Sequence, residues 1–221
     1  MDEKKIAAFF DVDKTLLVKD SAEIGFKYLW KLRMVSPLFL LKITMLNQFY
    51  KRDRLSARAM AEYCLRYYRG RKFQVFLDGV GDYYVNWMKP YLSPAVVAKV
   101  REHQAAGHTL VLLSASVRYY LNELAKDLGI EHMLCTRLEI DKDGVCTGRT
   151  LGPPMIGEEK KTAAQEFARV HGIDLAASYA YSDHHSDLPL LESVGHPVVV
   201  RPTERLRKIA RERSWAIMEI S

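Results

Sequence analysis

The chain has 221 residues, of which 48% are hydrophobic and 27% are charged. Disordered chains carry fewer apolar residues, and collagen-like or low-complexity chains carry more glycine and proline, so this composition excludes all three classes and indicates a globular protein. The formal net charge is +6. A net positive charge is typical of proteins that bind nucleic acid or an anionic surface. Whether it indicates such a partner here depends on where the charged residues lie in the chain.

The positive charge is concentrated in two segments. Residues 27–72 hold twelve lysines and arginines against two acids, a net charge of +10, and residues 201–213 contribute a further +4. The rest of the chain therefore carries −8. The sequence indicates an acidic body with a basic insert and a basic C-terminal segment.

The cysteines and the apolar residues bear on the location of the protein. Cys64, Cys135 and Cys146 form no CxxC pair, which argues against a disulfide framework and a zinc site and favours the cytoplasm. No secretory signal is visible at the N-terminus. The longest apolar region, residues 34–46, is interrupted by Pro37 and is shorter than the roughly 20 residues that a spanning helix needs. We expect at most a peripheral contact with the inner face of a membrane.

Predicted strands and helices alternate along most of the chain. Continuous apolar runs at 6–10, 108–113 and 197–200, with a mixed run at 178–181, are typical of central parallel strands buried on both faces. Helical patterns occupy 94–107, 117–128, 158–170 and 203–213, and the first of them has Ser93 as its N-cap and Pro94 as its first residue. This alternation predicts an α/β fold with a doubly wound, Rossmann-like parallel sheet.

Residues 19–90 interrupt the alternation, because they contain four helix-like stretches and no convincing strand. We therefore expect a helical cap inserted after the first strand, with residues 1–18 and 91–221 forming the core domain. Residues 138–141 and 145–148 predict a short hairpin whose turn contains Asp143-Gly144.

Pairs of carboxylates follow two of the predicted strands. Asp11 and Asp13 come directly after the first strand, and Asp183 and Asp187 follow the strand at 178–181. The carboxyl ends of parallel strands form the ligand crevice of a doubly wound sheet, so we expect both pairs at one edge. Unscreened acids so close together repel unless a divalent cation lies between them.

Hydroxyl groups and lysines add to this pattern. Ser114 and Ala115 follow the second strand at an expected strand-to-helix turn, where hydroxyls and free backbone N–H groups suit an anion such as phosphate, although Ser114 is equally suited to be an N-cap. Lys160 and Lys161 lie near the start of a predicted helix. Their position is compatible with solvated surface charge, or with one of the two facing inward toward the site. His184 and His185 are interpreted as crevice-lining residues at most, because Mg²⁺ prefers oxygen ligands.

These segments together resemble a known family. Asp11-Val12-Asp13-Lys14-Thr15, Ser114 after an apolar strand, Lys160, and Asp183 with Asp187 are similar to the four motifs of the haloacid dehalogenase superfamily. The insert after the first motif resembles the C1-type cap of its subfamily I, and the spacing is most similar to the subfamily IB hydrolases, which include the phosphoserine phosphatases. The resemblance covers about residues 5–220 and implies a Mg²⁺-dependent phosphatase that hydrolyses a phosphomonoester through an aspartyl-phosphate intermediate.

The resemblance also implies the catalytic and metal-binding residues. Asp11 would be the nucleophile, and Asp13 would protonate the leaving alkoxide and then take a proton from water. Asp11, the backbone carbonyl of Asp13 and Asp183 would hold Mg²⁺.

The remaining roles concern phosphate and substrate. Ser114 and Lys160 would bind the transferring phosphoryl oxygens. Counting back from the turn at 172–174 places Lys160, rather than Lys161, at the family's lysine position. The other residues assigned to the site are Thr15, which would orient the nucleophile's loop, Ala115 and Ser186 beside the phosphate, and Asp187, which would support Lys160 or the metal's water shell.

The substrate is expected to be a small phosphorylated metabolite of the phosphoserine kind. Asp20 lies near the position where phosphoserine phosphatases carry an acid that contacts the substrate amine. Two departures from the phosphoserine phosphatases weaken this prediction. Ser186 replaces an asparagine of the fourth motif. No arginine falls at the cap position expected to bind the substrate carboxylate, because Arg58 and Arg66 are only near that position and Glu62 lies closer to it.

The cap also suggests a second substrate class. Apolar side chains are dense at 28–30, 37–41, 43, 45–46 and 49–50, with basic residues on both sides. This pattern is typical of a surface that rests on anionic lipid, and equally of a helix packed inside the cap or of a homodimer face. A membrane-associated phosphatase of the lysophosphatidate or phosphatidylglycerophosphate type is therefore the alternative.

Two other protein classes share some of these features. A receiver-type signalling domain that accepts a phosphoryl group also combines aspartates, a hydroxyl and a lysine, but it has no large insert after its first strand. A nucleic-acid-binding module would account for the basic insert and its tyrosines, but not for the polar groups at four strand ends or adjacent loops. We expect no nucleic-acid partner, because a basic cap beside a phosphate site attracts anionic substrates.

Overall fold

The computed structural model describes residues 5–50, 52 and 54–220. Residues 1–4, 51, 53 and 221 belong to the predicted domain ranges but lie outside the described residues. Residues 1–4 are also the start of the N-terminal segment in which no secretory signal is visible.

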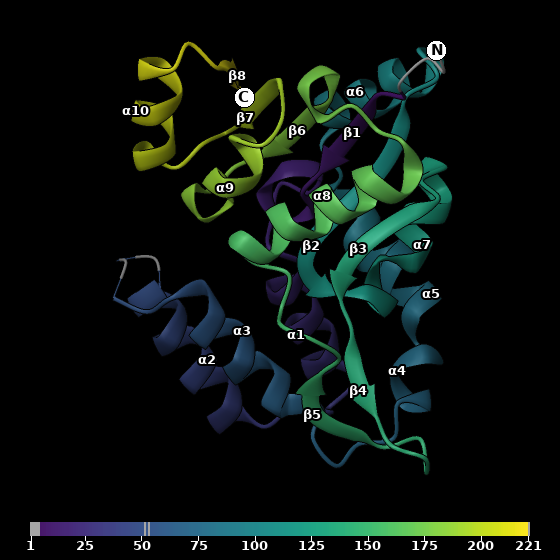
Figure 1. Ribbon diagram of the computed structural model, residues 1–221. Coiled ribbons are helices and arrows are strands. Elements are labelled where there is room, and N and C mark those ends of the chain that lie inside the picture. Colours follow the sequence, from purple (N-terminus) through teal and green to yellow (C-terminus); the bar gives the residue numbers. More distant parts are fainter. Residues whose placement is uncertain (1–4, 51, 53, 221) are drawn as a thin grey trace.

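Six parallel strands form the centre of the molecule, in the order β3-β2-β1-β6-β7-β8 (Figure 1). They are β1 (Ala7–Phe10), β2 (Thr109–Val117), β3 (His132–Thr136), β6 (Tyr179–Ser182), β7 (His196–Val200) and β8 (Ala216–Met218). The sheet extends from β1 through β2 and β3 on one side and through β6, β7 and β8 on the other. The topological switch point, where such sheets bind ligands, therefore lies beside β1. The predicted α/β fold with a doubly wound sheet is confirmed.

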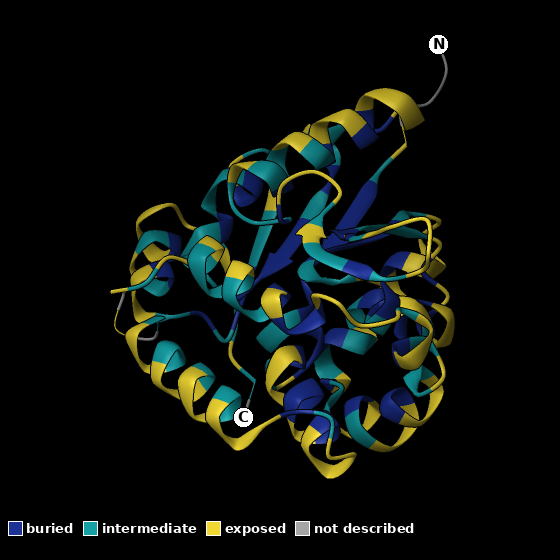
Figure 2. Cartoon of the chain, turned by 90° about the horizontal axis from the view of Figure 1, so that it is seen from below, coloured by how far each residue is buried: buried dark blue, intermediate teal, exposed yellow. Residues whose placement is uncertain are grey.

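Helices cover both faces of the sheet, and side chains alternate between the two layers along β1. Ala8 and Phe10 pack with α6 (Pro94–Ala105) and α7 (Arg118–Leu128). Ala7 and Phe9 pack with α8 (Glu158–His171), α9 (Leu188–Leu191) and α10 (Glu204–Glu212). All four β1 side chains are fully buried, and Figure 2 shows the buried centre of the sheet. Burial on both faces explains why the central strands are continuously apolar.

Three details of the secondary structure differ from the sequence prediction. The sequence does not predict β3 and β8, which are the edge strands and are only partly buried, so neither forms a continuous apolar run. β2 runs past its predicted end to Val117, and its pairing with β3 is irregular between Ser114 and Val117. Ser93 precedes α6 as predicted, but its hydroxyl makes no capping hydrogen bond, so the start of the helix depends on Pro94 instead.

The described part of residues 19–90 forms helices and turns. The helices are α1 (Ser21–Lys31), α2 (Pro37–Tyr50), α3 (Ala57–Leu65), α4 (Gln74–Leu77) and α5 (Val80–Asp82). The predicted hairpin is present as antiparallel β4 (Leu138–Ile140) and β5 (Cys146–Thr150). Leu138 and Cys146 share a buried cluster with Phe26 and Tyr67, so the hairpin packs against the helices that follow β1.

Candidate active site

Asp11 lies at the carboxyl end of β1, beside β6. Its backbone N–H donates to the carbonyl of Tyr181 at 3.0 Å, which continues the pairing of the two strands. The chain then turns through a short helical segment, Val12–Leu16, in which Lys14 adopts a left-handed φ of 54°. The guanidinium of Arg201 donates hydrogen bonds to the carbonyl of Lys14 and to two further carbonyls of this turn. Arg201 therefore holds the turn that separates Asp11 from the cap.

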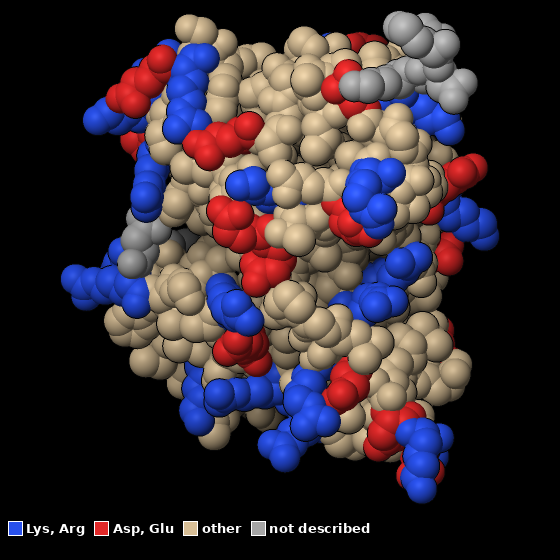
Figure 3. Space-filling model, in the orientation of Figure 1, with Lys and Arg blue, Asp and Glu red and all other residues tan. Residues whose placement is uncertain are grey.

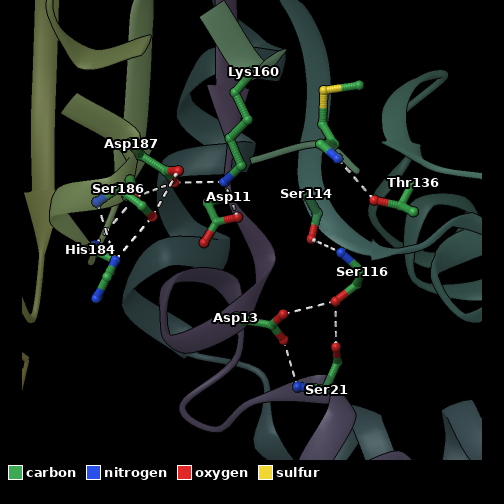
Figure 4. A network of polar contacts seen from close by, with 12 residues as sticks. Asp11, Asp13, Ser21, Ser114, Ser116, Thr136, Lys160, His184, Ser186 and Asp187 are labelled. Atoms are coloured by element: carbon green, nitrogen blue, oxygen red, sulfur yellow. Dashed lines mark hydrogen bonds and ion pairs between the residues drawn. The ribbon is translucent and has the colours of Figure 1, made fainter. Parts of the chain in front are cut away.

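A buried lysine joins two carboxylates of this edge (Figure 4). The Nζ of Lys160 donates to Oδ1 of Asp11 at 2.7 Å and to Oδ2 of Asp187 at 2.6 Å. The Oγ of Ser182 donates to the same Asp187 oxygen at 2.7 Å. Lys160, Asp11 and Asp187 are 3%, 6% and 3% exposed. Buried charges of this kind depend on one another, because water does not solvate them.

The two adjacent lysines, Lys160 and Lys161, differ in environment. Lys160 is inside the carboxylate cluster, whereas Lys161 lies at the surface, with its Nζ 3.6 Å from a Glu158 oxygen. Of the two candidates from the sequence, the structure brings Lys160 to the site.

Negative charge exceeds positive charge in this cluster. Burial raises the pKa of Asp11 to about 7, with Lys160 acting in the opposite direction. Burial also raises the pKa of Asp183 well above its usual range, and Asp11 adds to that shift. Burial by itself would lower the pKa of Lys160, but Asp11 and Asp187 raise it above its usual value, so the ammonium stays protonated. A further cation beside Asp11 and Asp183 would stabilise the ionised form of these two buried carboxylates.

The residues present fit Mg²⁺ better than a metal that needs a complete protein cage. Within residues 5–50, 52 and 54–220, no group of three or more His, Cys, Asp or Glu side chains is arranged to hold a metal. The predicted ligand set has only two side chains, Asp11 and Asp183, with the Asp13 carbonyl as the third oxygen. Mg²⁺ keeps several waters and takes one or two carboxylates from the protein, so this set is sufficient for it.

Ser114 occupies a different structural position from the predicted one. It lies within β2 and is fully buried, and its Oγ accepts a hydrogen bond from the Ser116 N–H at 3.1 Å. α7 starts directly after Val117, so the predicted strand-to-helix turn at Ser114 is wrong, as is the alternative of Ser114 as its N-cap. The strand extends farther because β3 pairs with its end.

The other predicted substrate residues are divided between the cavity wall and the interior. Ala115, Asp20 and Ser186 line the cavity, whereas Thr15 is fully buried and its hydroxyl has no hydrogen-bond partner in the described part of the chain. The Asp20 carboxylate is 3.1 Å from the Lys14 ammonium, so a substrate amine would compete with Lys14 for it.

The two histidines of the β6 loop are placed differently. His184 lines the cavity, and its Nδ1 lies 2.9 Å from Oγ of Ser186. Its ring is also 5.7 Å from that of Tyr50, at the end of α2. His185 does not belong to the described cavity wall.

A cavity of about 650 Å³ extends from the carboxylates into the cap. Its far walls are mostly apolar and come from α1, α2 and α3; they include Phe26, Leu29, Leu40, Ile43, Met60 and Leu65. None of the described lining residues is an arginine. Arg58 and Arg66, the arginines nearest the expected register, lie off the wall, where Arg58 pairs with Glu62 and Arg66 lies over the ring of Tyr63.

Comparison with known protein families identifies the chain. The family model of the haloacid dehalogenase-like hydrolases matches residues 8–192, a span that contains Asp11, Lys160, Asp183 and Asp187. The chain belongs to this family. The resemblance predicted from the four motifs is thereby confirmed, and with it the assignment of the protein as an enzyme of the hydrolase class.

Several relatives of this hydrolase are similar over nearly its whole length. It is 28% identical to the histidinol-phosphatase of Neisseria meningitidis, over 97% of this chain and 98% of that protein. It is 30% identical to the phosphoserine phosphatase SerB1 of Mycobacterium tuberculosis, over 96% and 70% of the two chains. A solved structure of a protein of unknown function from Bordetella pertussis has a TM-score of 0.87 and 30% identity, over 98% and 99%.

Two serines of the hydrolase site were not predicted from the sequence. The Oγ of Ser116 donates to Oδ2 of Asp13 at 2.8 Å, and the backbone N–H of Ser21 donates to Oδ1 at 2.5 Å (Figure 4). The two serine hydroxyls are themselves 2.6 Å apart. Ser116 stands two residues after Ser114, and Ser21 is the first residue of α1, but only the folded chain brings them to Asp13. The network connects Asp13 to the end of β2 and to the first helix of the cap.

Proposed function

We propose that this hydrolase is a Mg²⁺-dependent phosphomonoesterase that acts through an aspartyl-phosphate intermediate. The observation that carries the proposal is the Asp11 carboxylate at the end of β1, fixed by the buried Lys160 at the base of a cavity that opens into the cap. A nucleophilic carboxylate beside a protonated lysine suits phosphoryl transfer, in which negative charge develops on the transferring oxygens.

In the first step an Asp11 oxygen attacks phosphorus, the new O–P bond forms and the bond to the ester oxygen breaks. The leaving alkoxide takes a proton from Asp13. Lys160 orients Asp11 through Oδ1 and offers positive charge to the phosphoryl oxygens. In the second step Asp13, now a carboxylate, takes a proton from water, and the resulting hydroxide attacks phosphorus and releases Asp11 and phosphate. In the structure both oxygens of Asp13 accept hydrogen bonds, which fix the orientation of its carboxyl group.

Magnesium would be held by Asp11, Asp183 and the carbonyl of Asp13. When bound, it neutralises the excess negative charge of the cluster and polarises a phosphoryl oxygen.

Binding of Mg²⁺ should therefore increase the thermal stability of the folded protein. A saturating concentration of Mg²⁺ should raise the melting temperature by about 5 °C or more at pH 8. The increase should be smaller at pH 5, because the ligands bind the metal only when ionised and burial raises the pKa of Asp11 to about 7. Differential scanning fluorimetry with EDTA as the baseline measures the shift, and Asp183→Asn should lose most of it. An equal shift in that variant would remove Asp183 from the proposed ligand set.

Ser116→Ala should impair the proposed general acid selectively. Without the hydroxyl that holds Oδ2 of Asp13, kcat/KM for an alkyl phosphate should fall about tenfold, since its leaving group needs a proton. For p-nitrophenyl phosphate, whose leaving group is stable without one, the loss should stay below about threefold. Steady-state kinetics on both substrates checks the difference, and Ser116→Thr should restore most of the loss. Equal losses on the two substrates would show that Ser116 only supports packing.

Two substrate classes are compatible with this site. The names of the relatives support a small phosphate ester that carries an amino group, and Asp20 on the cavity wall would contact that group after displacing Lys14. No arginine of the described wall is available for an amino-acid carboxylate, which favours histidinol phosphate over phosphoserine within this class. The apolar far walls support the second class, a lipid phosphate of the lysophosphatidate or phosphatidylglycerophosphate type.

The proposal also covers the location of the protein, which we place in the cytoplasm and, for a lipid substrate, peripherally at the membrane. The three cysteines are free, as a reducing compartment requires. Turnover of phosphoserine, histidinol phosphate, lysophosphatidate and phosphatidylglycerophosphate with Mg²⁺ tests the proposal. No turnover of any phosphate ester, including p-nitrophenyl phosphate, would overturn it.

A further inference from the structure

Helix α2 presents different residues on two opposite faces. Its inner face, with Leu40, Ile43 and Tyr50 beside the polar Thr44, Asn47 and Gln48, lines the active-site cavity. Its outer face is exposed to solvent, although it carries a row of large apolar side chains at spacings of three and four residues. They are Leu38 (61% exposed), Leu41 (58%), Met45 (54%) and Phe49 (43%). No described residue of α2 is buried.

This outer face differs from the other exposed apolar positions of the molecule. Val85 and Val170 are as exposed as the α2 residues, but they lie far apart in the chain and on different elements, as is common in water-soluble proteins. On α2 the apolar side chains form one continuous row, and Trp30 and Leu32, both about half exposed, stand at the end of the neighbouring α1. A continuous apolar row of this kind indicates a docking surface.

Exposed basic residues flank the row along the chain. Lys42 is exposed on α2 itself, Lys31 and Arg33 precede the helix, and Arg52 and Arg54 follow it, all of them exposed. Figure 3 shows several lysine and arginine side chains at the lower left of the molecule, where Figure 1 places α2 and α3, and others over the upper half. An apolar stripe bordered by cations is complementary to the headgroups and the acyl boundary of an anionic bilayer.

A second copy of the chain fits this face less well than a lipid surface. In a twofold dimer the same patch contacts itself, so the lysines and arginines around α2 would face each other. Within the described residues, no helix is long and apolar enough to cross a membrane. The contact that these features favour is therefore a helix lying on the surface of the bilayer.

We propose that α2 docks on an anionic membrane through its outer face, and that the cavity behind it receives the acyl chain of a lipid phosphate monoester. The phosphate lies at Asp11, and the chain lies among Phe26, Leu40 and Ile43. The ring of Tyr50, at the C-terminal end of α2, lies 5.7 Å from that of His184 in the β6 loop. The inference rests on the proposed phosphomonoesterase function, and it specifies the substrate and where the enzyme meets it.

Vesicle binding tests the docking face. Wild-type protein should sediment with vesicles of phosphatidylcholine and phosphatidylglycerol at low salt, and the bound fraction should fall as salt is raised. The double variant L41E/M45E should reduce the bound fraction at least about tenfold. V85E/V170E introduces the same charge at equally exposed positions and should bind like the wild type. Docking is refuted if the wild type stays in the supernatant at low salt, if both double variants lose binding equally, or if L41E/M45E instead converts a dimer into a monomer.

Monomeric alkyl phosphates test the cavity without a membrane. From butyl to octyl phosphate, kcat/KM should rise by about 10²-fold, because each methylene leaves water for an apolar wall. Ile43→Asp should flatten this dependence. A flat dependence in the wild type would overturn the acyl-chain site. Turnover of p-nitrophenyl phosphate separates the two proposals: if it is present while chain length has no effect, only the inference fails, and if it is absent, the proposed phosphatase function fails.

Discussion

Asp11→Asn should lower the turnover of p-nitrophenyl phosphate with Mg²⁺ by about 10³-fold or more. The amide cannot form the aspartyl-phosphate that the proposed mechanism requires. The substitution also replaces one of the two carboxylates that pair with the Lys160 ammonium by a neutral amide. Steady-state kinetics measures the loss, and rapid quenching with mass spectrometry should find a phosphoryl group on the peptide that contains Asp11 in the wild type alone.

Asp143→Asn provides the matched control for this change. Asp143 is exposed in the turn of the hairpin, so the same substitution there should leave turnover within about twofold of the wild type. Wild-type rates in Asp11→Asn would exclude Asp11 as the nucleophile.

Lys160→Met should reduce both stability and activity. The change leaves Asp11 and Asp187 buried without their shared ammonium, and removing one partner of a buried ion pair costs about 3–5 kcal/mol of unfolding free energy. Turnover should also fall by about 10²–10³-fold, because the phosphoryl oxygens lose a positive charge.

The loss of stability in Lys160→Met should depend on pH. Burial already raises the pKa of Asp11 in the folded state, and without the opposing ammonium that pKa rises further, so the folded state binds more protons than the unfolded state. Stability then falls as pH rises, and the loss should be largest at pH 8 and smaller at pH 5. Urea denaturation at both values, with EDTA present, measures it.

Lys161→Met is the control for this experiment. Its Nζ is 3.6 Å from Glu158 at the surface, where an ion pair contributes about 1 kcal/mol or less. Similar losses in the two variants would contradict the role given to Lys160.

Most of the active-site edge could be predicted because its residues follow strands that are buried on both faces. Phe9 and Phe10 have no exposed surface, so the run before Asp11 is continuously apolar, and the same is true of the run before Ser114. The edge strands β3 and β8 have one partner strand each and are partly exposed, so their sequences lack this signal. The missing β3 also explains the wrong position of Ser114, since β3 pairs with the extension of β2.

Contacts across the cap boundary could not be predicted. Ser21 and Ser116 are 95 positions apart, yet both hold the Asp13 carboxylate. The position of Asp20 in the chain predicts a contact with the substrate, whereas in the structure its carboxylate lies 3.1 Å from the Lys14 ammonium. Pairings of this kind arise from the way the cap lies over the core, and periodicity along the chain contains no information about that.

The sequence by itself determined the fold class, the two pairs of carboxylates that follow strands and the concentration of positive charge in residues 27–72. Each of these depends on the order of residue types along the chain: apolar runs for strands, acids directly after them, and a local excess of lysine and arginine. Only the tertiary structure decided which serines hold Asp13, and that one face of α2 lines the cavity while the other is left in solvent. The physical reason is that burial and hydrogen bonding between distant segments are properties of packing, and packing exists only when the whole chain is folded.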